Sequence, residues 1–244
     1  MLMQLVLLFL FAGVPHYVYF EKTKKLNYEN IFFLSAFLVI TGMILEFIYP
    51  QEPSSPFVLV ALLASLFSFY KASKTTNLHK LTYYILFFNA PIIIMLESKP
   101  GMLYGISLLF TLFGIHLMAK YYEKNYGSAN YRQVTGITLV SPYAGLFLTL
   151  YLTTLALYPP FPNSLLFLNA VLSADVNVLW YLVVVVIFFG NFLIAVKVMA
   201  RTVFGKPNHN VHYIDLTPKE RWVHLGMFAL LLILSIIGLK EVLS

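Results

Sequence analysis

The sequence contains no cysteine and few charged residues, and each shortage excludes a class of protein. Without cysteine, the chain can form neither disulfides nor iron–sulfur clusters nor thiolate metal sites. Charged residues make up 11% of the 244 positions, against about 25% in a soluble globular domain. So few charges cannot cover a water-facing surface, so lipid must cover much of this chain. The net charge of +6 is therefore assigned to loops at one membrane face, and nucleic-acid binding is not expected.

Long apolar runs make up most of the chain and predict an all-α fold. Hydrophobic residues are 60% of the sequence, and the mean hydropathy is +0.81. A helix needs about 20 apolar residues to cross the hydrocarbon core. We expect a polytopic transmembrane helix bundle of about eight spans, forming one domain over 1–244. The first run lacks a basic leader and a cleavage site, which argues against a signal peptide. The predicted spans are 2–20, 30–48, 57–70, 81–96, 102–119, 137–157, 178–196 and 222–239.

Lysine and arginine are concentrated in four loops, and this predicts the orientation of the chain. Fourteen of the 16 basic residues lie in 21–29, 71–80, 120–132 and 197–221. The positive-inside rule places these loops in the cytoplasm and the N-terminus outside. We expect an integral protein of a bacterial or archaeal plasma membrane. The remaining connections carry mainly Glu52, Glu97, Lys99 and Asp175.

Prolines interrupt the apolar region that follows residue 137. Pro159 and Pro160 lack amide donors and stop a helix, and a short apolar piece at 164–174 follows Pro162. The alternation of basic and other loops allows 137–157 to cross only once. The piece at 164–174 is therefore a half-helix or the second half of a broken helix, as at transporter ion paths. An outer loop followed by an interfacial helix is the alternative.

Four segments, in order along the chain, match motifs of one membrane-protein family. They are YGSANYRQVTGI at 126–137, LALYPPFP at 155–162, VKVMARTVFGKP at 196–207 and DLTPKE at 215–220. Residues 76–244 resemble the C-terminal part of the antiporter-like, proton-conducting subunits of respiratory complex I, cation/proton antiporters and membrane-bound hydrogenases. Residues 1–75 have no counterpart in this resemblance. The chain is about half as long as such subunits, which implies a truncated and diverged member.

The resemblance implies passage of protons or sodium ions along charged side chains midway across the membrane. In the family these are a Lys or Glu on the half-helix after the break, and a His and a Lys on earlier helices. The first position falls near Phe167 here. His116 and Lys120 keep the family's HxxxK spacing but lie close to a basic loop. Because no Asp, Glu, Lys or Arg lies in the middle of a predicted span, a partner would have to supply the missing charges.

Five polar residues are candidates for an ion path. Lys197 lies in the last turns of an apolar run, and snorkelling of its long side chain to the surface is the alternative. Asn169 and Asn191 lie within apolar runs, where hydrogen bonds that only hold helices together are the alternative. The full set of ion-path candidates is Lys197, Asn169, His116, Lys120 and Asn191.

The sequence indicates no cofactor and no catalytic site. His209, His212 and Asp215 form a weak metal signal, for which a solvated loop is the alternative, and no metal is predicted. We expect a non-redox subunit of a proton-translocating complex, completing or sealing an ion path. Its partners would be other integral membrane subunits, a full-length antiporter-like subunit among them, and the lipid bilayer. The alternative is a structural or assembly protein that keeps the fold without transport.

Overall fold

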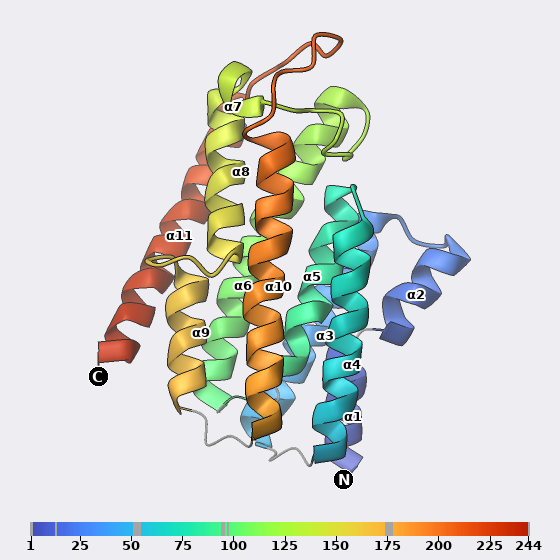
Figure 1. Ribbon diagram of the computed structural model, residues 1–244, viewed down its shortest axis with the longest axis vertical. Helices are drawn as coiled ribbons and strands as arrows, with labels where there is room; N and C mark the ends of the chain where they lie inside the picture. Colours follow the sequence, from blue (N-terminus) through green and yellow to red (C-terminus); the bar gives the residue numbers. More distant parts are fainter. Residues whose placement is uncertain are drawn as a thin grey trace.

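The computed structural model describes residues 2–12, 14–50, 55–93, 96, 98–173 and 178–243. The described residues form helices and connections, without a β-sheet (Figure 1). In chain order the helices are α1 (Leu2–Ala12), α2 (Val14–Thr23), α3 (Tyr28–Ile48), α4 (Ser55–Lys74), α5 (Leu78–Ile93), α6 (Ser98–Tyr126), α7 (Ile137–Val140), α8 (Pro142–Leu155), α9 (Pro162–Ser173), α10 (Val178–Thr202) and α11 (Pro218–Leu243).

Five of the described helices are long and apolar enough to cross a membrane: α3, α4, α6, α10 from Trp180 onward, and α11. The bent pair Leu2–Phe11 and His16–Thr23, with 46° between its halves, would be a sixth span if it forms one crossing. The all-helical fold is therefore confirmed, but the count of about eight spans is not. The reason is length, because α5, α8 and α9 have 16, 14 and 12 residues. These lengths give about 24, 21 and 18 Å of helix, short of a core about 30 Å thick.

Helix α5 lies at the centre of the bundle. All of its residues except Lys80 are buried. Helices α4, α6, α3, α1 and α10 pack against it. Because α5 is surrounded, its polar side chains find their partners on several neighbouring helices.

The chain breaks between α8 and α9, where the prolines predict it. Helix α8 ends at Leu155 and α9 begins at Pro162. Helix α9 continues below α8 along the long axis and packs against α6 and α11 (Figure 1). The connecting turn lies about half-way along the bundle, and Tyr158, Pro159 and Pro160 are exposed on it. The break is thus within the length of the bundle and not at its end.

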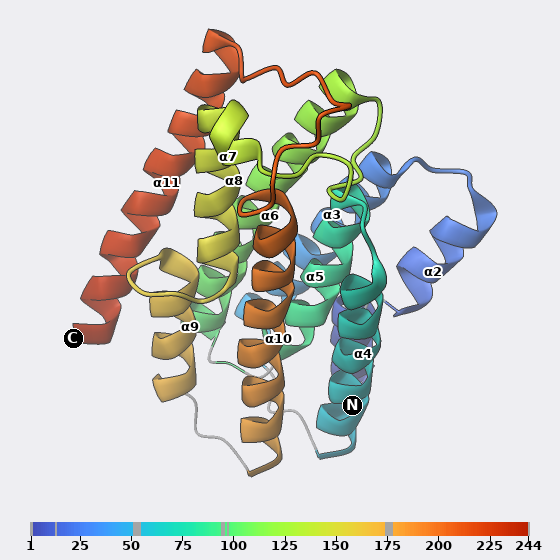
Figure 2. The same cartoon turned by 45° about the horizontal axis from the view of Figure 1, so that its top comes forward.

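The loops rich in lysine and arginine lie towards one end of the bundle and contact one another there (Figures 1 and 2). The hydroxyl of Tyr131 donates to the carbonyl of Thr75 at 3.0 Å. Gly136, with a φ of +62°, touches the 203–217 loop so closely that a Cβ there would lie 2.6 Å from the nitrogen of Pro207. Two of the family-like motifs therefore meet at Gly136. Three acidic residues assigned to the opposite loops, Glu52, Glu97 and Asp175, lie outside the described residues.

The DLTPKE segment fixes the start of two helices at this end. The Asp215 carboxylate accepts the backbone N–H groups of Tyr143 and Ala144, at 3.3 and 3.1 Å, and so caps α8. The backbone N–H of Thr217 donates to the Glu220 carboxylate at 2.9 Å, while the Glu220 N–H donates to the Thr217 hydroxyl at 3.4 Å. This reciprocal pair is a capping box for α11.

Candidate functional site

Five titratable side chains meet where α3 and α5 begin and α6 ends. Glu29 lies in the first turn of α3 and His79 in the first turn of α5. His116, Lys120 and Glu123 lie in the last turns of α6. Because α3 and α5 run opposite to α6, their first turns lie beside its last turns, under the basic loops (Figure 1). These five residues are called the histidine cluster below.

Asparagine caps position the two helices that begin at the cluster. The Asn27 side chain accepts the N–H of Asn30 at 2.8 Å at the start of α3. The Asn77 side chain accepts the N–H of Lys80 at 3.1 Å at the start of α5. An asparagine at this position satisfies a helix N–H group that would otherwise lack a partner. Each cap therefore fixes where its helix starts, and so the positions of Glu29 and His79.

Four members of the cluster form a row. The Nδ1 atoms of His79 and His116 lie 3.3 Å apart, so one donates to the other. Nε2 of His79 lies 3.2 Å from Oε2 of Glu123, and Nε2 of His116 lies 3.9 Å from Oε1 of Glu29. If His79 donates from Nε2 to Glu123, its Nδ1 must accept from Nδ1–H of His116. Nε2 of His116 then carries no proton and faces Glu29. This tautomer assignment follows from the hydrogen-bond pattern.

The row runs from a buried interior to exposed ends. The His116 side chain is fully buried, whereas the side chains of Glu29 and Glu123 are 31% and 62% exposed. Phe32 stacks on the His116 ring at 4.8 Å between centroids, and Phe33 meets it edge-on at 5.1 Å. These rings shield His116 from the lipid side. Nε2 of His116 has no hydrogen-bond partner among the described residues, and Oε1 of Glu29 lies 3.9 Å from it.

A polar cavity of about 410 Å³ gives access to the cluster. Glu29, His79 and Glu123 line it together with Glu21, and Lys24 lies at the same wall. Lys120 forms an ion pair with Glu29, and Glu21 accepts the hydroxyl of Tyr83 at 2.7 Å. Three glutamates and one lysine line the cavity, so carboxylates outnumber basic groups at its wall. The His116–Lys120 pair predicted from its spacing does face one partner, Glu29.

A second polar group lies deeper, between α5, α6 and α10. Asn89 and Asn191 exchange two amide hydrogen bonds, at 3.0 and 2.6 Å. The hydroxyl of Tyr104 donates to Oδ1 of Asn89 at 2.8 Å, and all three side chains are buried. A Cβ on Gly190 would lie 2.8 Å from Cε1 of Phe88, so glycine is needed for this close approach. Asn191 on α10 is therefore hydrogen-bonded to Asn89 on α5.

Helix α9 carries its own polar contact at its start. The Ser107 hydroxyl donates to Oδ1 of Asn163 at 2.5 Å, and the Thr111 hydroxyl lies 3.3 Å from the same atom. Nδ2 of Asn163 is buried without a hydrogen-bond partner among the described residues. This contact fixes the start of α9, after Pro162, against α6. Asn169, the residue predicted on α9, is half-buried and lies outside this contact.

Lys197 lies near the basic end of α10. Its ammonium donates to the backbone carbonyl of Ser73, in the last turn of α4. A cation at this place satisfies a helix-end carbonyl and interacts favourably with the helix dipole. Lys197 does not join the histidine cluster. Asp215 is likewise engaged, because its carboxylate caps α8. The described residues contain no group of three or more His, Cys, Asp or Glu suited to a metal ion.

Sequence reasoning missed three members of the row. Glu29, His79 and Glu123 are separated from their partners by many residues, and only helix packing brings them together. A usable signal exists: each lies within one or two turns of a predicted span end on the same basic side. Comparison of the chain with protein-family models and with curated proteins gives no match. The resemblance to antiporter-like subunits therefore stays a prediction.

Proposed function

We propose that this chain is a membrane subunit of a proton- or cation-translocating complex of the complex I, hydrogenase or antiporter type. In that complex it would complete or seal an ion path. The observation that carries the proposal is the row Glu29–His116–His79–Glu123. Imidazole is the side chain suited to accept and release protons near neutral pH. Two of them joined through Nδ1, with a carboxylate near each outer nitrogen, form a route for protons.

Proton movement along the row follows from the tautomers. A proton taken up by the Glu29 carboxylate would pass to the bare Nε2 of His116. The Nδ1 proton of His116 would then pass to Nδ1 of His79, and the Nε2 proton of His79 would pass to Glu123. One proton has moved, both imidazoles are neutral again, and their tautomers are reversed. A small side-chain rotation or one water would close the 3.9 Å gap between Glu29 and Nε2 of His116.

The exposed break between α8 and α9 supports a partner subunit. Irregular backbone at membrane depth is tolerated only against protein or a wet cavity. Tyr158, Pro159 and Pro160 are exposed about half-way along the bundle, where lipid alone could not satisfy the carbonyl groups of the turn. A full-length antiporter-like subunit packed on this turn would cover it.

Protons that use the row would need a partner subunit to carry them across the rest of the membrane. The row lies at the basic end, and the sequence of α6 between Lys99 and Lys120 contains no Asp, Glu, Lys or Arg. The alternative is a structural or assembly protein without transport. It is favoured by the Asn89–Asn191 pair and by Lys197, whose contacts all hold helices together.

We further propose a plasma-membrane protein with its N-terminus outside and its basic loops in the cytoplasm.

The test is proton flux through the intact complex in sealed vesicles. His116→Gln keeps hydrogen bonding but cannot relay a proton, so we expect flux to fall at least about tenfold with the complex still assembled. His224→Gln is the matched control, because His224 is a buried histidine outside the row, and its hydrogen bond among the described residues is to Tyr151, at 2.9 Å. Equal flux in both variants would reject the relay. A loss of flux that simply follows loss of assembled complex would favour the structural alternative.

A further inference from the structure

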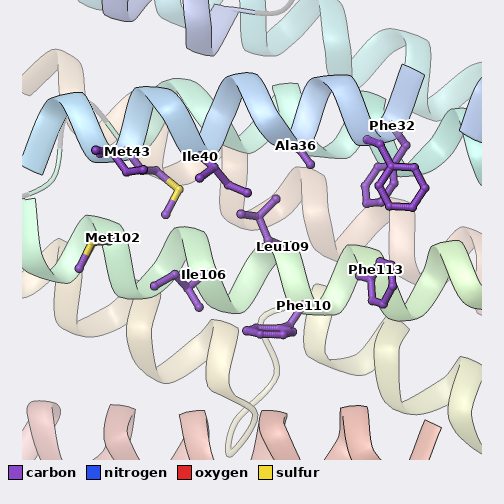
Figure 3. Close-up of a pocket in the computed structure, with 11 residues that line it drawn as sticks. Phe32, Ala36, Ile40, Met43, Met102, Ile106, Leu109, Phe110 and Phe113 are labelled. Carbon is purple, nitrogen blue, oxygen red and sulfur yellow. The ribbon is translucent and has the colours of Figure 1, made fainter. Parts of the chain in front are cut away.

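An apolar groove runs between α3 and α6 (Figure 3). It measures about 410 Å³, and the eleven described residues that line it are all apolar, six from α3 and five from α6. In Figure 3 the side chains of Ala36, Ile40 and Met43 face those of Ile106 and Leu109 across the seam. Both helices are candidate spans, so the groove lies at the depth of lipid chains.

The shape and lining of the groove favour a slender apolar chain. From Phe32 to Ile44 it follows thirteen residues of α3, a rise of about 18 Å. Closely packed helix pairs in membranes are enriched in small residues along the contact, and Ala36 is the one small residue among those that line the groove. A partner's helix therefore fits poorly, whereas the tail of a lipid buries its methylene groups along the whole length.

The groove leads to an ion pair between a carboxylate and an ammonium group. The helical rows that line it continue, by one to two turns, to Glu29 on α3 and Lys120 on α6. These two side chains form an ion pair across the same seam, and they are 31% and 45% exposed. A headgroup that carries a phosphate and an ammonium matches this pair, with phosphate at Lys120 and ammonium at Glu29. A headgroup with only negative charge would meet the Glu29 carboxylate.

We propose that the α3–α6 groove binds one zwitterionic phospholipid of the phosphatidylethanolamine type. One acyl chain lies in the groove, and the headgroup lies at Glu29 and Lys120. This is a ligand site additional to the proposed function. The lipid site does not depend on proton movement. The isolated chain should therefore retain the lipid.

The experiment reconstitutes the full chain in vesicles of equal phosphatidylethanolamine and phosphatidylglycerol, extracts it in detergent and measures the retained lipid by mass spectrometry. We expect about one phosphatidylethanolamine per chain. Ala36→Phe fills the groove, and excluding two methylene groups of the tail lowers the affinity about tenfold. Ala229→Phe is the matched control, since Ala229 is an exposed alanine on α11.

Two further variants keep the test decisive. If Ala36→Phe does not fold, Ile40→Trp narrows the groove from a position that is 42% exposed, with Ile233→Trp, 54% exposed, as its control. Glu29→Gln should shift the retained lipid from phosphatidylethanolamine towards phosphatidylglycerol. Equal retention of both lipids by the unaltered chain, or unchanged retention in the groove variants, would overturn the proposal. Self-association of the chain through the groove, lost in Ala36→Phe, would overturn it as well.

Discussion

Helix α6 can approach α8 only because residue 114 is glycine. A Cβ on Gly114 would lie 2.5 Å from Cζ of Tyr151, well inside the distance that real Cβ contacts allow. The Tyr151 ring is fully buried, and its hydroxyl is held by Nδ1 of His224 at 2.9 Å, so it has little freedom to move away. We expect the overpacking in Gly114→Ala to cost about 1–3 kcal/mol, its usual range. Alanine also brings a gain of about 1 kcal/mol to a helix interior, so the expected net destabilisation is up to about 2 kcal/mol.

Reversible unfolding in mixed detergent, followed by circular dichroism, measures this effect. Gly226→Ala in α11 is the control, because a Cβ there has no atom within 4 Å. That variant should be as stable as the unaltered chain, or more stable by up to about 1 kcal/mol. Adding Tyr151→Leu to Gly114→Ala should recover part of the loss, since the two residues are in contact and their effects are not additive. Equal stability of Gly114→Ala and Gly226→Ala would refute the reasoning.

Three other predictions concern packing, capping and orientation. Asn191→Leu leaves Asn89 without its reciprocal amide and should cost about 1 kcal/mol in the same unfolding assay; no loss would mean that the pair is not formed. Asp215→Ala removes the cap of α8 and should cost about 1 kcal/mol, whereas a stabilised variant would contradict the cap. The chain has no cysteine, so His209→Cys creates a single thiol in an exposed loop. A membrane-impermeant thiol reagent should label it only from the cytoplasmic side, and labelling from outside would reverse the proposed orientation.

The helices themselves were largely predictable, because local features determine them. Apolar runs mark the helices, Pro159 and Pro160 mark the break, and Pro162 starts α9. The span count was less predictable, since hydropathy cannot tell a short buried helix such as α5 from a full span. Helix α5 is buried on every side by neighbouring helices, and the sequence pattern does not predict which helices these are.

The candidate site was predictable only in part. The spacing of His116 and Lys120 placed them on one face of α6, and both do face Glu29. Their link to His79 and Glu123 depends on how α5 packs against α6, which no local pattern encodes. Lys197 illustrates the same limit, because its partner, the carbonyl of Ser73, belongs to a helix more than 100 residues earlier.

Gentle detergent extraction of the tagged chain from membranes where it is naturally made, with mass spectrometry of the proteins that accompany it, tests the central claim most directly. A long antiporter-like subunit should co-purify, together with quinone-reductase, hydrogenase or antiporter subunits. The contact should weaken when Tyr158 on the exposed break is replaced by aspartate. Recovery of the chain alone, as a monomer or as an oligomer of itself, would contradict its role as a subunit of an ion-translocating complex.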